Sequence, residues 1–261
     1  ECVFLEKEKK AKTSKMTLMA LEQRVLLDAS FPVIANTIFH FDALDVDGDG
    51  LTNDQPADGA LIDRWDDDSG NNYDAASSGG NRPRFDAAGF EGRGAINFDG
   101  TSDYLDIANA TEINTGSYSE KSFAMVFETG ADISGTQMLY EQGGGSNGYN
   151  IIMVGGDLYV YTWGESYWAA ADRYKSVNLG TVTANTVYYV TAVHDATDAD
   201  INNRTFSVSL NGGPAQVLTR VDTLGSHSGN VTIGHSNDSQ TPVGDAHLGS
   251  WSHFQGNIGE F

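Results

Sequence analysis

The chain has 261 residues, of which 39% are hydrophobic and 10% aromatic, so one large β domain or two small ones could form a core. Its 15 Lys and Arg residues against 36 Asp and Glu give a net charge of -21, which argues against nucleic acid and anionic membrane surfaces as partners. A single cysteine, Cys2, excludes an internal disulfide. No apolar run reaches the about 18 residues of a membrane-spanning helix.

Residues 1–33 differ from the rest of the chain in composition and pattern. Residues 1–27 hold six basic and four acidic side chains, whereas the remainder holds nine basic and 32 acidic ones, a net charge of -23. Apolar positions in "LMALEQRVLL" recur at helical spacing, and Pro32 then interrupts the pattern. We therefore expect an N-terminal leader over 1–33 that is separate from a domain over 34–261.

From residue 36 onward the chain changes to short apolar runs separated by Gly, Asn, Asp and Ser. Alternating or β-branched stretches predict strands at 36–43, 94–100, 122–128, 149–154, 157–163, 186–195, 205–212, 215–221 and 230–235. No internal segment has a convincing helical period. The sequence therefore predicts an all-β, antiparallel two-sheet sandwich. The strand pattern of "FQGNIGEF" is still running at residue 261, so we expect the domain to be truncated at its final strand.

Two stretches carry a resemblance to a known family. They are "LIDRWDDDSGNNYDA" (61–75) and "NRPRFDAAGFEGRGAINFDGTSDYLDI" (81–107), with Trp65, an Asp-Ser-Gly-Asn run from Asp68, and Phe-Asp-Gly from Phe98. In this order the motifs resemble the bacterial laminin G-like domains of the concanavalin A-like lectin/glucanase superfamily. The resemblance covers about residues 36–261 and implies a jelly-roll sandwich.

A second resemblance lies in the leader. "LEQRVLLDA" (21–29) is similar to the Leu-Glu-Pro-Arg-x-Leu-Leu signature near the start of very large bacterial surface or secreted proteins, with Gln23 in place of the proline. It implies an extracellular or cell-surface location and other domains or copies in a larger surface assembly. The alternative is a chance amphipathic leader.

The stretch "DVDGDGLTNDQPADG" (45–59) has the spacing of a calcium-binding loop. Three aspartates occupy positions 1, 3 and 5, and Gly50 supplies the sharp turn at position 6. Pro56 stands at position 12, where an EF-hand has a bidentate Glu, so another carboxylate has to complete the shell. The candidate ligands within this insertion, 45–58, are Asp45, Asp47, Asp49, the Leu51 carbonyl, Asn53, and Asp54 or Asp58. We expect Ca²⁺, because three carboxylates packed so closely are costly without a cation; the alternative is a solvated acidic hairpin tip.

The family resemblance also implies a structural calcium between an early aspartate and the last strand. Asp66, Asp68 and Glu260 are the candidates for this second, weaker site. The alternative is ordinary turn chemistry, in which Asp and Asn side chains accept local backbone hydrogen bonds.

Catalysis is not expected. Glycoside hydrolysis in this superfamily uses two carboxylates on one strand face, in a Glu-x-Asp-x-x-Glu arrangement that the chain lacks. Its six histidines show no HExxH spacing.

Aromatic residues crowd together in "YVYTWGESYW" (159–168), where Tyr159, Tyr161 and Trp163 alternate along one strand face as core residues would. Beyond Gly164, loop aromatics could stack on a sugar ring or anchor a protein partner. The candidate ligand-binding residues are Tyr167, Trp168, Glu165 and Trp251. The alternative is that these rings cover one end of the sandwich.

Together these features favour a non-catalytic, calcium-stabilised adhesion module of a large bacterial surface or secreted protein, with a glycan or a surface protein as partner. A structural subunit or spacer of an extracellular filament or envelope assembly is the alternative. A glycan-cleaving enzyme is the third hypothesis.

Overall fold

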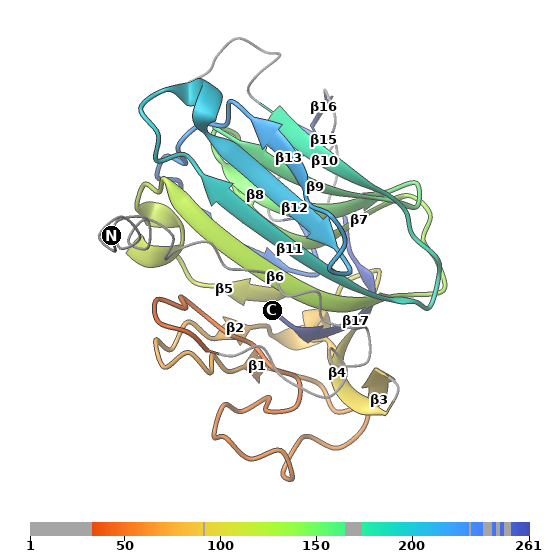
Figure 1. The fold of residues 1–261 in the computed structure, drawn as a ribbon. Helices are drawn as coiled ribbons and strands as arrows, with labels where there is room; N and C mark the ends of the chain where they lie inside the picture. Colours follow the sequence, from red (N-terminus) through yellow and green to blue (C-terminus); the bar gives the residue numbers. More distant parts are fainter. Residues whose placement is uncertain are drawn as a thin grey trace, which may run out of the picture.

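Figure 1 shows a computed structural model of the chain, which describes residues 33–90, 92–164, 174–229, 231–236, 242–243, 246–247 and 252–261. Two antiparallel sheets pack face to face as a jelly-roll sandwich, so the expected fold class is confirmed. The eight-stranded sheet has the order β1 (Arg64–Trp65), β2 (Ala75–Ala76), β5 (Leu105–Ile107), β14 (Val231–Ile233), β7 (Thr136–Gly143), β8 (Gly148–Val154), β9 (Asp157–Trp163), β10 (Tyr174–Thr181). The seven-stranded sheet has the order β13 (Gln216–Thr219), β12 (Thr205–Leu210), β11 (Val187–Asp195), β6 (Glu120–Thr129), β17 (Gln255–Glu260), β4 (Arg93–Asp99), β3 (Arg84–Phe90).

The remaining elements are short. β15 (Pro242–Val243) pairs with β16 (Ala246–His247) as a two-stranded ribbon. The helical turns in the described ranges are η1 (Gly79–Asn81), η2 (Thr111–Thr115) and η3 (Ile201–Asn203). No helix in the described part of the chain combines the length and apolarity needed to cross a membrane. The leader predicted over 1–33 falls almost entirely outside the described residues.

Most strands that the alternation predicted are present, but one prediction was wrong. Residues 36–43 form no strand; only an isolated bridge joins Asp42 to Glu260. The segment still runs beside β17, because the backbones of Phe41 and Phe261 exchange hydrogen bonds of 2.8 and 3.0 Å. Three longer strands, β3, β7 and β10, were not predicted. In β7 seven of the eight residues are buried, so the two faces do not alternate in polarity.

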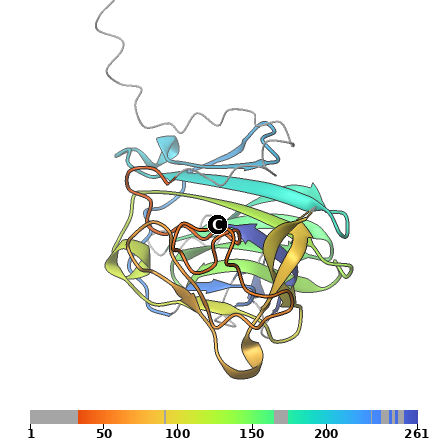
Figure 2. The same cartoon turned by 90° about the horizontal axis from the view of Figure 1, so that it is seen from below.

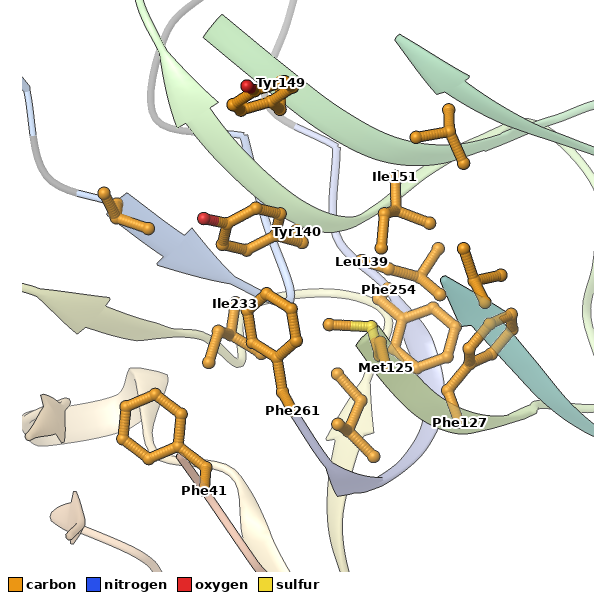
Figure 3. Packing of buried hydrophobic residues seen from close by; sticks show 14 of the residues in the cluster. Phe41, Met125, Phe127, Leu139, Tyr140, Tyr149, Ile151, Ile233, Phe254 and Phe261 are labelled. Carbon is orange, nitrogen blue, oxygen red and sulfur yellow. The ribbon is translucent and has the colours of Figure 1, made fainter. Parts of the chain in front are cut away.

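The core lies between the two sheets and is rich in aromatic rings. Figure 3 shows Phe261, at the end of the chain, pointing into this cluster together with Tyr140 and Phe41. Its ring meets that of Tyr140 edge-on at 4.5 Å between centroids. Phe254 and Phe127 are likewise fully covered. Phe254 and Phe261, the residues on either side of β17, therefore both contribute side chains to the core.

The N-terminal segment packs against this same region. Figure 2 shows it, in orange, lying beside the C-terminal end of the chain. Trp65, fully buried, contacts Phe41 at 5.5 Å between ring centroids, and its indole Nε1 donates to the Asp42 carbonyl at 3.1 Å. These contacts bring the acidic stretch that starts at Asp45 against the acidic stretch that follows Trp65.

Candidate metal and ligand sites

The acidic loop is organised around the Asp45 side chain. Its two carboxylate oxygens accept hydrogen bonds from the backbone nitrogens of Asp49, at 3.2 Å, and Gly50, at 2.7 Å. The loop turns back on itself because Gly48 and Gly50 take positive φ angles of 63° and 85°, which glycine adopts without strain. One carboxylate oxygen from each of Asp45, Asp47 and Asp49 then lies within 4.8 Å of the others. The predicted positions 1, 3 and 5 therefore converge.

Gln55 closes the loop and is a residue that the sequence did not single out. Its Oε1 accepts from the Val46 backbone nitrogen at 2.9 Å, and its Nε2 donates to the Leu51 carbonyl at 3.0 Å. The Leu51 carbonyl, predicted as a metal ligand, is thus engaged within the loop. The sequence gives no signal for this role of Gln55 other than an amide side chain that follows the acidic loop.

A second pair of carboxylates faces the same loop. The Asp66 backbone nitrogen donates to the Val46 carbonyl at 2.9 Å, which holds the two acidic stretches together. A Cβ atom at residue 48 would lie 3.1 Å from Asp66 Cβ and 3.1 Å from Asp68 Oδ1, so Gly48 allows this close approach. The Asp68 Oδ1 atom is buried and has no hydrogen-bond partner among the described residues. The two sites predicted separately thus adjoin each other.

The crowding of carboxylates changes their proton affinities. Burial, and after it the charge of Asp45, raises the pKa of Asp68 to about 7. Burial also raises the pKa of Asp45, against the two backbone hydrogen bonds that it accepts. For Asp66, burial raises the pKa even though Arg64 binds this carboxylate with two nitrogens. Burial is the largest cause of each rise, and a cation bound beside these carboxylates would favour their ionised forms.

The third residue of the weaker predicted site lies on the far side of a histidine. Glu260 Oε1 is 3.0 Å from His40 Nε2, and His40 Nδ1 is 3.8 Å from Asp68 Oδ2. Burial lowers the pKa of His40, but the hydrogen bond and charge of Glu260, with Asp68 and Asp42, raise it above the ordinary value overall. His40 therefore stands between Asp68 and Glu260, and the predicted trio of Asp66, Asp68 and Glu260 does not converge on one point.

The other predicted loop ligands are more distant from the cluster or exposed. Asp58 accepts a hydrogen bond from the Ala87 backbone nitrogen at 3.1 Å, at the start of the β3 bulge. Asn53 and Asp54 are exposed, and the group of three carboxylates found in the described ranges consists of Asp45, Asp47 and Asp49.

The aromatic row of β9 lies on the outer face of the eight-stranded sheet, not in the main core. Tyr161 and Trp163 are buried in a separate cluster with Met138 and Ile152, against which half-buried Tyr159 packs. The Trp163 indole covers the glycines of the β7–β8 turn and donates to the Gly144 carbonyl at 2.8 Å. The predicted ligand-binding residues themselves, Glu165, Tyr167, Trp168 and Trp251, lie outside the described residues.

Comparison with known proteins gives structural neighbours only. No family model matches the chain, and no curated protein sequence matches it significantly. The binding domain of botulinum neurotoxin serotype G superposes with a TM-score of 0.53 at 12% identity, over 87% of this chain and 47% of that one. The binding domain of Paraclostridial Mosquitocidal Protein 1 gives 0.52 at 12% identity, over 77% and 47%. The botulinum neurotoxin serotype D ligand-binding domain, in complex with N-acetylneuraminic acid, gives 0.51 at 14%, over 85% and 46%.

The shared fold is a β-sandwich. At these identities the likeness shows the fold alone, and the chain spans about half the length of each of these binding domains. All three neighbours are described as binding or ligand-binding domains.

Proposed function

We propose that this chain is a non-catalytic binding module that is stabilised by Ca²⁺ at the acidic loop. The observation that carries the proposal is the convergence of Asp45, Asp47 and Asp49 on a loop whose neighbours, Asp66 and Asp68, add two further carboxylates. Hard oxygen ligands in this number suit Ca²⁺, which takes six to eight of them. The binding role is supported by the fold of the neighbouring structures, which is an argument by analogy.

The proposed ion would stabilise the fold by linking two acidic stretches of the chain. The acidic loop belongs to the N-terminal segment, and the facing stretch follows Trp65, which is buried in the core. A cation held by both stretches would fasten this segment to the sandwich in a chain that has no disulfide. Asp45, Asp47 and Asp49 would be the ligands, with Asp68 Oδ1 the best placed of the neighbouring oxygens because it has no hydrogen-bond partner among the described residues.

Calcium titration followed by thermal unfolding tests the metal part of the proposal. The double variant Asp47→Asn/Asp49→Asn removes two exposed carboxylates and should abolish the stabilisation by calcium. The control is Asp198→Asn/Asp200→Asn, which removes two exposed carboxylates from the loop before η3. Equal calcium responses in the two double variants would contradict the proposed site, because they would indicate non-specific screening.

For the ligand we propose a glycan or a surface protein, with Tyr167, Trp168, Glu165 and Trp251 as the candidate contact residues. The support is the sequence of that loop, together with the sialic acid complex of one neighbour. Large surface proteins of bacteria remain the proposed setting, on the resemblance of "LEQRVLLDA" alone. A glycan array probed with the full chain in calcium tests the carbohydrate class directly, and loss of binding in Trp168→Ala should follow.

A further inference from the structure

A lysine and a glutamine meet in the interior between the two sheets. Lys121 lies on β6, where the side chains of Phe123, Met125 and Phe127, at alternate positions with it, pack in the core. Its Nζ donates to Gln142 Oε1 at 3.1 Å and to the Ile113 carbonyl at 2.5 Å. Gln142 lies on β7 of the opposite sheet and is only 2% exposed. The contact therefore spans the sandwich.

The carboxamide of Gln142 is held in one orientation and polarised. Its Oε1 accepts a second hydrogen bond, from the Tyr140 hydroxyl at 2.8 Å, and its Nε2 donates to the Ile113 carbonyl at 2.7 Å. When Lys121 is the nucleophile, the Tyr140 hydroxyl is the donor that can stabilise negative charge developing on Oε1 during attack on the carbon. Tyr140 is itself fixed by its edge contact with Phe261, as Figure 3 shows.

The burial of the Lys121 amine favours its neutral, nucleophilic form. Burial lowers the pKa of Lys121 to about 7, so much of it is neutral near physiological pH. Within the described part of the chain, no carboxylate lies within ion-pair distance of its Nζ, which instead sits 4.7 Å from the centre of the Tyr118 ring. A desolvated neutral lysine is a nucleophile toward carbonyl carbon.

His227 is the candidate base for the proton that Lys121 loses. Burial, and after it the charge of Lys121, lowers the pKa of His227 to about 4, so its imidazole is neutral. The His227 Nδ1 atom is buried and has no hydrogen-bond partner among the described residues. Its backbone nitrogen donates to the Asn114 carbonyl at 2.9 Å, which ties it to the η2 turn that supplies the Ile113 carbonyl. A neutral imidazole whose pKa is influenced by the Lys121 charge is the candidate group to accept the proton that the amine loses.

We propose that Lys121 and Gln142 join in an intramolecular isopeptide bond. The Lys121 Nζ lone pair attacks Gln142 Cδ, forming the N–C bond, while Tyr140 stabilises the charge on Oε1. His227 takes up the proton that Nζ loses, the Cδ–Nε2 bond breaks, and Nε2 gains one proton and leaves as ammonia. No oxidant, reductant or co-reactant is needed. The product covalently links the seven-stranded sheet to the eight-stranded one.

Intact mass measurement of the unfolded full chain tests the bond directly. The wild-type protein should weigh less than its sequence by one ammonia molecule, and a peptide map should place the loss in a branched peptide that joins Lys121 to Gln142. Lys121→Met and Gln142→Leu should each restore the full mass. Lys175→Met, which changes a half-buried lysine on β10, should keep the loss.

The wild-type mass alone decides the proposal, even if a variant fails to fold. A folded wild-type chain with its full sequence mass would overturn it. So would an ammonia loss that maps elsewhere, for example to a cyclised asparagine before a glycine. His227→Ala should lower the fraction of linked chains at a fixed time after refolding, and an unchanged fraction would remove His227 from the proposed reaction.

Discussion

Asp68 is a partly buried carboxylate beside the acidic loop, and its surroundings disfavour the ionised form of its side chain. Its Oδ1 is buried without a hydrogen-bond partner among the described residues, and its pKa is raised to about 7 by burial and by Asp45. The folded chain therefore holds a proton at Asp68 more tightly than the unfolded chain does. Without metal, the free energy of unfolding should fall as the pH rises from about 4 toward about 7, since the pKa of Asp68 in the folded chain lies above its ordinary value.

Asp68→Asn should remove this part of the pH dependence. In chelator, the variant should lose less stability than the wild type between acid and neutral pH, measured by denaturant unfolding at several pH values. Adding calcium to the wild type should have a similar effect, because a bound cation favours the ionised carboxylate. Asp54→Asn, at an exposed position of the neighbouring loop, is the control. Identical pH profiles for wild type and Asp68→Asn would refute the raised pKa.

Trp168 and Trp65 should separate binding from folding. Trp168→Ala should weaken glycan or partner binding by about 1–3 kcal/mol, in the range of hot-spot truncations, and leave the melting temperature nearly unchanged. Trp65→Ala should cost about 3–5 kcal/mol of stability, because Trp65 is fully buried against Phe41. Binding by titration calorimetry and melting by circular dichroism measure the two effects. If Trp168→Ala unfolds the chain, the Trp168 ring contributes to folding and not to binding.

The strand β17 connects several parts of the molecule. It pairs with β4 and β6, and its last residues bond to the N-terminal segment at Phe41 and Ala43. On its outer face Gly259 leaves room for the ring of Phe90, which the β3 bulge folds over the sheet. A glycine is required there because of the close approach of an aromatic ring.

Gly259→Ala should therefore destabilise the sandwich. The new Cβ would lie 2.2 Å from Phe90 Cε2, so the ring or the strand has to shift, and overpacking of this kind costs about 1–3 kcal/mol. Gly80→Ala is the matched control, since a Cβ there meets nothing within 4 Å. Denaturant unfolding compares the two. Equal stability of the variants would mean that Phe90 moves away freely.

The sequence predicted the all-β sandwich, but it did not predict every strand or the bounds of each one. Strands such as β9 and β11 were recognisable because they are rich in aromatic and β-branched residues, whereas β7 was missed because it carries the buried polar side chains Gln137, Glu141 and Gln142. The segment 36–43 alternates like a strand, yet it meets β17 at an isolated bridge.

The candidate site was predictable in part for a similar reason. Asp45, Asp47 and Asp49 are close in sequence, so spacing alone brought them together. The approach of Asp68 depends on contacts across more than 20 positions of the chain, through Trp65 and the His40 carbonyl, and no local pattern encodes it. His40 was missed because a lone histidine in a β domain gives no signal of its partners.

Removal of the leader should leave the sandwich intact. A chain that starts at residue 33 keeps the Phe41 to Phe261 hydrogen bonds and the Trp65 contacts, so its melting temperature should match that of the full chain within a few degrees. Circular dichroism melts of both chains measure this. An insoluble or molten product would mean that the leader packs on the sandwich or on another copy, which favours the assembly hypothesis.

A cation at the acidic loop is proposed to hold the N-terminal segment on the sandwich, and the melting temperature should therefore differ between calcium and chelator. With calcium at about a hundredfold excess over a Kd of about 0.1–1 mM, the wild type should gain about 2.7 kcal/mol. For a domain of this size that raises the melting temperature by roughly 5–10 °C. Asp47→Ala should lose most of the gain. An unchanged melting temperature of the wild type in excess chelator and in calcium would contradict the account.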